Sequence, residues 1–257
     1  MLALNLPPVI GHRGAAGHAP ENTLAGFRLA KELRCRWVEF DVRLTVDEAL
    51  VVCHDDRLDR TTNGRGRISK LPLSAVQELD TGSWFAPRFA GERMPTLDEA
   101  LSCCRELGLG ANVEIKAEHG RGAVTARAVA AVLEKLKHAS PPVLISSFLT
   151  DAVAEAAAQM PSVPRGMLWR KLPRSWRAAA EQLDCTTIHL GQADLDEITA
   201  AKVMSVGYPL LAYTVNDPQR ARELFGWGVA SVFSDIPGII ARAVADDLAG
   251  VRGRASL

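Results

Sequence analysis

The sequence lacks the features that mark several large classes of protein. Its 257 residues include 30 basic and 30 acidic side chains, and no run of either sign forms the charged stripe that binds nucleic acid or anionic lipid. No stretch approaches the roughly 20 apolar residues of a membrane-spanning helix. The opening residues, MLALNLPPVI, carry no basic segment of the kind that begins a secretory signal peptide. We therefore expect a cytoplasmic protein with no nucleic-acid partner and no stable membrane association.

Cysteine pairs and nucleotide-binding loops are also missing. The five cysteines are odd in number and show no C-x-x-C spacing, which favours reduced thiols in the core over disulfides or a zinc site. No G-x-G-x-x-G motif and no P-loop follow any predicted strand. Their absence argues against an open, doubly wound nucleotide-binding sheet, which is the main alternative for the pattern described next.

What the chain does have is a regular alternation of short β-rich runs with helical segments. The predicted strands are residues 9–12, 37–42, 111–116, 143–147, 165–169, 186–190, 209–214 and 230–234. Strands that alternate with helices pair in parallel, and eight such units can close a barrel. We predict one domain, residues 1–257, folded as a (β/α)8 TIM barrel.

Residues 55–95 break this rhythm, because they are rich in glycine and proline and show little helical periodicity. We predict a small insertion over the C-terminal mouth of the barrel, where loops set specificity. Its aromatic residues Trp84, Phe85 and Phe89 are candidates for contact with a substrate. Packing a small core within the insertion is the alternative role for them.

Three acidic residues are predicted to share the barrel mouth. Glu39 and Asp41 stand two apart on the second predicted strand and so point to one face, and Glu114 has the same position on the next strand. Carboxylates this close repel each other unless a cation or a proton intervenes. Oxygen ligands suit Mg²⁺ or Ca²⁺ better than zinc. The sequence predicts a divalent-metal site, with ion pairs to Lys116 or Arg13 as the alternative.

Two histidines are predicted to flank this acidic cluster. His12 ends the first predicted strand. His54 follows the second strand too closely for a crossover, so that segment must return as an antiparallel hairpin; a turn centred on residues 47–48 pairs Asp41 with His54, give or take one residue. Two imidazoles beside a cation suit phosphodiester cleavage, one taking a proton and one giving a proton, while Arg13 offsets charge on the phosphoryl oxygens.

The motifs HRGAAGHAPENT, residues 12–23, and VEFDVRLTVDEALVVCHDDRLDRTTNG, residues 38–64, resemble the signatures of the glycerophosphodiester phosphodiesterase family. The motifs NVEIK, residues 112–116, and AYTVN, residues 212–216, fit the same family. The likeness runs in the family's order over nearly the whole chain and is greatest to the short cytosolic bacterial members. It implies a small-molecule substrate, a deacylated phospholipid such as glycerophosphocholine or glycerophosphoethanolamine, cleaved to sn-glycerol 3-phosphate and an alcohol.

The resemblance also implies roles for individual residues. It assigns one Mg²⁺ or Ca²⁺ ion to Glu39, Asp41 and Glu114, acid–base catalysis to His12 and His54, and phosphate contacts to Arg13 and Lys116. Tyr213 stands where many members have Trp, bordering the glycerol or the head group, and Glu48 stands where many have the glycine of a hairpin turn. The resemblance is compatible with attack on the phosphorus by water and with attack by the glycerol 2-hydroxyl, which gives a cyclic phosphate.

Two alternatives remain at this point. The first is a phospholipase C-like or D-like enzyme on the same fold, which would need apolar side chains around the mouth. The second is a non-catalytic module that binds phosphodiesters. The chain is expected to be a monomer or a homodimer.

Overall fold

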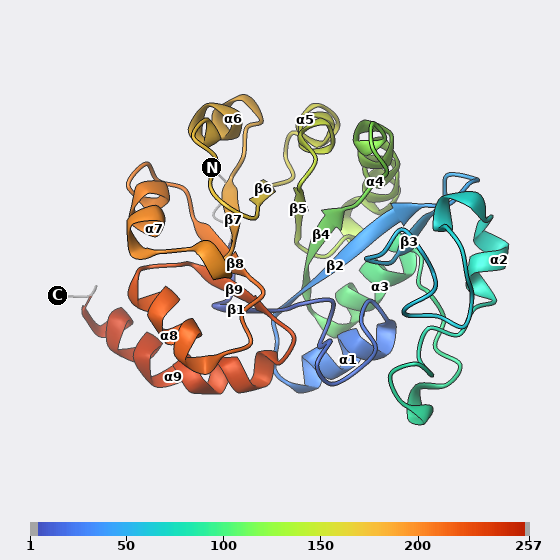
Figure 1. Cartoon of the computed structure of the whole chain (residues 1–257), viewed down its shortest axis with the longest axis horizontal. Coiled ribbons are helices and arrows are strands. Elements are labelled where there is room, and N and C mark those ends of the chain that lie inside the picture. Colours follow the sequence, from blue (N-terminus) through green and yellow to red (C-terminus); the bar gives the residue numbers. More distant parts are fainter. Residues whose placement is uncertain (1–4, 255–257) are drawn as a thin grey trace.

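The computed structural model describes residues 5–254 and contains a closed parallel barrel (Figure 1). Strand β1 pairs in parallel with both β2 and β9, which closes the sheet. The prediction of a TIM barrel is confirmed. The ends of the predicted domain, residues 1–4 and 255–257, lie outside the described residues. The strands are β1 (Val9–Gly11), β2 (Trp37–Leu44), β3 (Leu50–Val52), β4 (Gly110–Ile115), β5 (Val143–Ser147), β6 (Arg165–Trp169), β7 (Thr187–Gly191), β8 (Leu210–Tyr213) and β9 (Ser231–Ser234).

Helices surround the barrel, and most of them connect successive parallel strands; α2 lies in the insertion and α9 follows the last strand (Figure 1). They are α1 (Leu24–Glu32), α2 (Leu73–Gln77), α3 (Leu97–Leu107), α4 (Gly122–Leu136), α5 (Thr150–Gln159), α6 (Trp176–Gln182), α7 (Glu197–Met204), α8 (Pro218–Gly226) and α9 (Pro237–Arg254), with short 3-10 turns η1 (Ile68–Lys70), η2 (Pro87–Phe89), η3 (Lys137–Ala139) and η4 (Gln192–Asp194). The clearest local signal is at α3, where Thr96 and Glu99 form a capping box and satisfy free backbone donors of the first turn.

The barrel interior and its outer layer have separate cores. Inside the barrel, Ile10, Trp37, Leu144, Leu211 and Phe233 form one apolar cluster. The opposite faces of the strands pack on the helices in two larger clusters, one on the α1 to α5 side and one on the α6 to α9 side. Because the strands are buried on both faces, the polar residues at their C-terminal ends stand out as functional candidates.

The β2–β3 hairpin lies at the edge of its predicted register, which placed Asp41 opposite His54 give or take one residue. Val42 lies opposite Val52, and the Cys53 amide donates to the Asp41 carbonyl, so Asp41 faces Cys53 and not His54. The turn has a three-residue loop, 46–48, closed by a bond from the Thr45 amide to the Ala49 carbonyl. Glu48 has a φ of 61°, the left-handed conformation that completes such loops. The extra loop residue accounts for the one-residue shift.

The predicted insertion between β3 and α3 packs on a small core of its own. Leu58, Ile68, Val76 and Met94 are buried in that core together with residues of β3 and its end. The insertion also contacts the β1–α1 loop and α1, since the Ala25 amide donates to a carboxylate of the insertion. It therefore lies beside the strand ends that carry the site.

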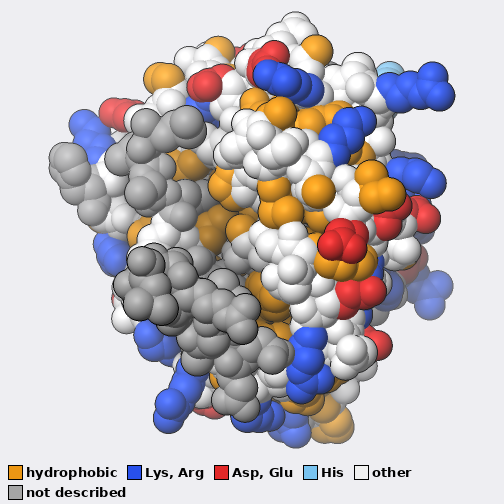
Figure 2. Space-filling model, turned by 90° about the vertical axis from the view of Figure 1, so that its left-hand side faces the viewer, with side chains coloured by type: hydrophobic (Ala, Val, Ile, Leu, Met, Phe, Trp, Pro, Cys, Tyr) orange, Lys and Arg blue, Asp and Glu red, His pale blue; other side chains and the backbone are white. Residues whose placement is uncertain are grey.

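No helix within the described residues is long and apolar enough to cross a membrane. Figure 2 shows the face on the left of Figure 1, where acidic and basic side chains are interspersed with hydrophobic ones. Among the described side chains on that face, charges of both signs occur, in keeping with the balanced charge of the sequence.

Candidate active site

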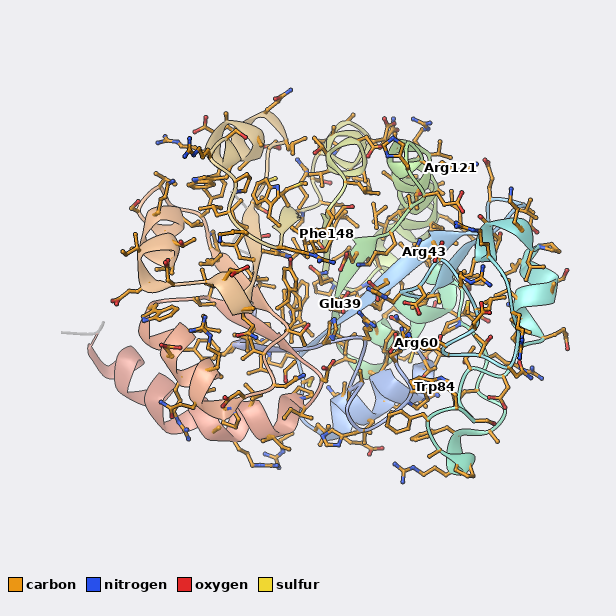
Figure 3. The ribbon with its side chains drawn as sticks, in the orientation of Figure 1. Glu39, Arg43, Arg60, Trp84, Arg121 and Phe148 are labelled. Atoms are coloured by element: carbon orange, nitrogen blue, oxygen red, sulfur yellow. The ribbon has the colours of Figure 1, made fainter. Side chains whose placement is uncertain are left out.

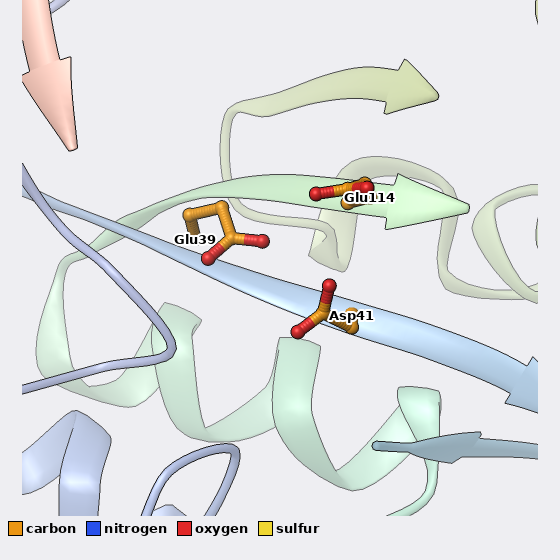
Figure 4. A group of neighbouring side chains, drawn as sticks. All are labelled: Glu39, Asp41 and Glu114. Atoms are coloured by element: carbon orange, nitrogen blue, oxygen red, sulfur yellow. The ribbon is translucent and has the colours of Figure 1, made fainter. Parts of the chain in front are cut away.

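Three buried carboxylates converge on one face of the neighbouring strands β2 and β4 (Figure 4). Asp41 and Glu114 are register partners on the two strands, and Glu39 lies two residues before Asp41 on the same face. One oxygen from each carboxylate lies within 4.8 Å of the other two. The period-two alternation of β2 and the parallel register of β4 are sufficient to bring all three together.

Two basic side chains accompany the carboxylates. The Lys116 ammonium contacts Glu114 and lies 3.4 Å from Oδ1 of Asp41. On the other side, Nε of Arg13 lies 3.4 Å from Oδ2 of Asp41, and the Arg13 amide donates to Oε2 of Glu39 at 3.0 Å. Asp41 is thus held between two cations, whereas Glu39 receives only a backbone hydrogen bond from this pair.

The pKa values of the three carboxyls diverge for this reason. Burial, with repulsion from Asp41, raises the pKa of Glu39 well above its usual value. Burial likewise raises the pKa of Glu114 to about 7. Burial acts on Asp41 too, but Lys116 and then Arg13 outweigh it and lower its pKa. Without a further cation, the cluster therefore tends to retain protons near neutral pH.

This cluster fits a hard divalent cation. Its possible ligands are carboxylate oxygens, which suit Mg²⁺ and Ca²⁺. Oε1 of Glu39 is buried and has no hydrogen-bond partner in the described part of the chain, so it is available as a ligand. The ligand set Glu39, Asp41 and Glu114 is the only group of this kind found among the described residues.

A tight turn after β1 carries His12 and Arg13. A Cβ atom added at Gly11 would lie 2.1 Å from the Gly14 carbonyl oxygen, so the chain can fold back at this point only without a side chain there. Gly14 has a φ of 90°, and Arg13 also adopts a positive φ, 49°. The Gly11–Gly14 stretch therefore sets the direction of the His12 and Arg13 side chains.

His12 is fixed by a carboxylate from the last strand of the barrel. Its Nδ1 lies 2.6 Å from Oδ1 of Asp235, directly after β9, and its Nε2 lies 3.9 Å from Oε2 of Glu39. The amide group of Asn216 donates to the other Asp235 oxygen at 2.5 Å. With Nδ1 occupied, Nε2 is the ring nitrogen that faces the carboxylate cluster.

His54 is fixed from within the hairpin and the insertion. Its Nδ1 lies 2.7 Å from Oδ1 of Asp55, and Arg60 donates to Oδ2 of Asp55 at 2.7 Å. Burial lowers the pKa of His54, and the charge of Asp41 acts in the opposite direction. The lowered value favours the neutral imidazole, the form that can accept a proton at neutral pH.

The chain matches known proteins over most of its length. The model of the "Glycerophosphoryl diester phosphodiesterase family" matches residues 12–239. A solved Oleispira antarctica phosphodiesterase, in complex with the product sn-glycerol-3-phosphate, is 40% identical with a TM-score of 0.91, covering 93% of this chain and 97% of its own. Glycerophosphodiester phosphodiesterases of Bacillus subtilis and Caldanaerobacter subterraneus are 31% and 32% identical, covering 90% and 89% of this chain and 84% and 94% of their own lengths.

The chain belongs to the glycerophosphoryl diester phosphodiesterase family. It is an enzyme with glycerophosphodiester phosphodiesterase activity.

Sequence reasoning missed several charged residues of this phosphodiesterase. Glu21 accepts from Arg13 at 2.7 Å and from both terminal nitrogens of Arg60 at 2.7 Å, which links the insertion to the β1–α1 loop. Asp235 and Asp55, the partners of the two histidines, were also missed. Asp55 directly follows His54, a signal that was available in the sequence. Asp235 directly follows β9, and its position at a strand's C-terminal end was an available signal too.

The aromatic candidates of the phosphodiesterase fall in two places. The Tyr213 ring, at the end of β8, packs edge-on against Phe148 at 5.8 Å, and the Lys116 ammonium lies 5.3 Å from the Phe148 centroid. Trp84 and Phe85 contact each other at 5.7 Å within the insertion, and Trp84 lies beyond Arg60 as seen from Glu39 in Figure 3. Substrate contact at Tyr213, Trp84 and Phe85 stays a prediction.

Proposed function

We propose that this enzyme hydrolyses deacylated phospholipids, such as glycerophosphocholine and glycerophosphoethanolamine, to sn-glycerol 3-phosphate and an alcohol. The observation that carries the proposal is the convergence of three carboxylates with two histidines, each of which has a carboxylate on its Nδ1. Glu39, Asp41 and Glu114 would hold one divalent cation, Mg²⁺ or Ca²⁺. The chemistry that such a cation supplies is Lewis-acid stabilisation of charge on the phosphoryl oxygens.

His12 and His54 form the proposed acid–base pair. One neutral imidazole accepts the proton of the attacking hydroxyl, and the protonated partner donates to the departing alkoxide. Attack by water gives sn-glycerol 3-phosphate directly, whereas attack by the glycerol 2-hydroxyl gives a cyclic phosphate that water opens in a second step with the proton roles reversed. The carboxylates Asp235 and Asp55 orient the two rings and favour the tautomer with the proton on Nδ1. In this arrangement the second nitrogen of each ring remains free for proton transfer.

Arg13 and Lys116 are proposed to contact the phosphate. Both are largely buried, and both lie against Asp41. Burial opposes the charge of Lys116, yet Asp41 and Glu114 raise its pKa, so the ammonium keeps its charge at neutral pH. Two fixed cations beside the reacting phosphorus offset the charge that develops in the transition state.

The whole chain is proposed to act as one catalytic domain with residues 55–95 inserted in it. Arg60 of the insertion contacts both Asp55 and Glu21, so the insertion supports the site as well as covering its edge. The expectations for oligomeric state and for cellular location stay predictions.

A chelation experiment tests the metal and the activity together. Purified enzyme is assayed for release of sn-glycerol 3-phosphate from glycerophosphocholine before and after EDTA treatment. We expect EDTA to abolish turnover and Mg²⁺ or Ca²⁺ to restore it. Full activity in excess chelator would refute the metal assignment.

Substrate comparison separates the main alternative. Intact phosphatidylcholine in vesicles is offered in parallel with glycerophosphocholine at equal concentration. Preference for the deacylated compound supports the proposal, whereas faster cleavage of the intact lipid indicates a phospholipase. Binding without turnover of any diester, in metal-supplemented buffer, would indicate a non-catalytic module.

A further inference from the structure

A cavity of about 180 Å³ lies next to the carboxylate cluster, where β2 and β4 lead into the β2–β3 hairpin, η1 and the start of α4. We call it the basic pocket. The charged residues that line it are Arg43, Lys70, Lys116, Arg121, Asp56 and Glu118. Its volume is below the roughly 300 to 1,000 Å³ of sites for drug-sized ligands, as suits a small head group.

The two acidic residues of the basic pocket share one guanidinium, Arg67, from outside it. Asp56 lies 2.8 Å from Nη1 of Arg67, which does not line the cavity. Glu118 accepts a hydrogen bond from the Ser69 hydroxyl at 2.6 Å and lies 3.4 Å from the same Arg67 nitrogen. With Arg67 counted, the basic side chains at the cavity outnumber these two carboxylates, and among the described ion pairs neither Arg43 nor Lys70 has a carboxylate within 4.0 Å.

Arg43 is a pre-positioned donor in the basic pocket. It shares the face of β2 that carries Glu39 and Asp41, since it lies two residues further along the strand. Its Nε donates to the carbonyl of His54 at 2.8 Å, which fixes the guanidinium beside the backbone of that residue. Among the described ion pairs no carboxylate lies within 4.0 Å of this guanidinium. Its planar fork is suited to a phosphate or a carboxylate.

The outer rim of the basic pocket adds two exposed cations, Arg121 and Lys70. Arg121, directly before α4, lies 3.4 Å from Glu48, and both side chains are largely exposed, at 45% and 67%. An ion pair of this kind contributes little energy and can be exchanged for a ligand. Lys70, on η1, is exposed on the same cavity.

Lys116 separates the basic pocket from an aromatic wall formed by Phe148 and Tyr213. Its ammonium lies 3.4 Å from Asp41 and 5.3 Å from the Phe148 centroid, and it also lines the pocket. Figure 3 shows Arg43 and Arg121 toward the insertion, to the right of Phe148 and Glu39. A phosphodiester at the carboxylates would have the aromatic wall on one side, suited to the carbon–hydrogen faces of glycerol, and the basic pocket on the other.

We propose that the basic pocket binds the leaving head group and selects substrates whose head group carries a further anionic group. Such a head group is preferred over a neutral polyol of the same size, and more strongly over the cationic choline. This inference rests on the proposed function, and it names the class of substrate within it.

A matched substrate pair tests the proposal. With metal-supplemented enzyme, kcat/KM is measured for glycerophosphoinositol and for glycerophosphoinositol 4-phosphate, which differ only in one phosphate group. We expect at least a roughly tenfold preference for the phosphorylated compound, the effect of one added charge-assisted hydrogen bond. The preference should shrink as NaCl is raised, since the rim cations are exposed.

Arg121→Gln and Lys70→Gln locate the effect. Each should reduce the ratio of the two kcat/KM values several-fold, whereas Lys202→Gln, an exposed cation on α7 across the barrel, should leave the ratio unchanged. Melting curves establish that all three variants fold.

Equal kcat/KM for the two inositol substrates, or a ratio that Arg121→Gln and Lys70→Gln do not alter, overturns the anionic selection while leaving the proposed function intact. A ratio that falls equally in Lys202→Gln also overturns it, because the preference would then come from the net charge of the protein and not from the basic pocket. Failure to hydrolyse any glycerophosphodiester, glycerophosphocholine included, overturns the proposed function itself.

Discussion

The two histidines of the site are held by different parts of the molecule. His12 is fixed by Asp235, a residue 223 positions away in the sequence, across the seam where β1 meets β9. His54 is fixed by its sequence neighbour Asp55, which Arg60 of the insertion holds in turn. The same local geometry, a carboxylate on Nδ1, therefore depends on closure of the whole barrel in one case and on a short segment in the other.

This difference indicates which parts of the fold are free to vary. The β1–β9 seam cannot shift without moving Asp235 away from His12. The insertion contacts the β1–α1 loop through partly exposed ion pairs of Arg60, which joins Asp55 to Glu21. Substitutions in the insertion are therefore expected to change the position of His54 and the shape of the neighbouring basic pocket, while His12 keeps its position.

The largest expected effect is loss of either imidazole. His12→Ala and His54→Ala should each lower kcat by about 10² to 10⁴, the usual contribution of a general acid or base. Steady-state assays on glycerophosphocholine measure the loss, with the exposed His119→Ala as control. Near-normal kcat in either variant would remove that histidine from the acid–base pair.

The next effect concerns the carboxylates behind the rings. Asp235→Ala and Asp55→Ala should each lower kcat by about tenfold to a hundredfold, the range for residues that orient a functional histidine. KM should change little, because neither carboxylate is proposed to touch the substrate. Asp59→Ala, at an exposed ion pair of the insertion, is the control. A loss in Asp235→Ala alone would show that His54 does not need its carboxylate.

A smaller effect is expected for Arg60, which acts on His54 only through Asp55. Arg60→Ala should lower kcat about threefold to tenfold and change the free energy of unfolding by no more than about 1 kcal/mol, since its ion pairs are partly exposed. Arg60→Lys should restore little, because an ammonium cannot reproduce the forked contacts to Asp55 and Glu21. Kinetics and chemical denaturation of both variants provide the test. Full activity of Arg60→Ala would contradict the proposal that Arg60 positions His54 through Asp55.

The smallest effect on activity is expected at a third histidine, which contrasts with the two histidines of the proposed acid–base pair. His189 is buried in the barrel with Thr187 at 2.9 Å as its hydrogen-bond partner, and burial lowers its pKa to about 3. Because this folded-state pKa is below the unfolded value of about 6.5, the unfolded state takes up a proton first as the pH falls.

His189 should therefore stabilise the fold above about pH 6.5 and lose that contribution between about pH 6.5 and pH 3, by on the order of 1 kcal/mol for each pH unit. Urea unfolding at pH 7 and pH 4.5 should show a smaller pH dependence for His189→Gln than for the unchanged enzyme. An unaltered pH dependence in the variant would exclude His189 as its source.

Much of the fold was predictable because its signals are local. Each βα unit carries its own apolar runs and helical periodicity, and the eight predicted strands coincide with the barrel strands within one or two residues. The carboxylate cluster was predictable for the same reason, since a period of two and a parallel register place Glu39, Asp41 and Glu114 on one face. The pairing of β2 with β3 was predictable only to within one residue. The sequence of the turn is compatible with a two-residue and with a three-residue loop, and the two loop lengths give registers that differ by one residue.

By itself, the sequence determined which chemical groups stand at the strand ends: three carboxylates, two histidines, Arg13 and Lys116. Only the tertiary structure decided their partners. Asp235 reaches His12 through closure of the barrel, Arg60 joins Asp55 to Glu21 through docking of the insertion, and Arg43 faces a cavity whose acidic residues are paired elsewhere. Alternation along a strand is set by neighbouring residues, whereas these contacts depend on packing between segments far apart in the chain, which no local pattern encodes.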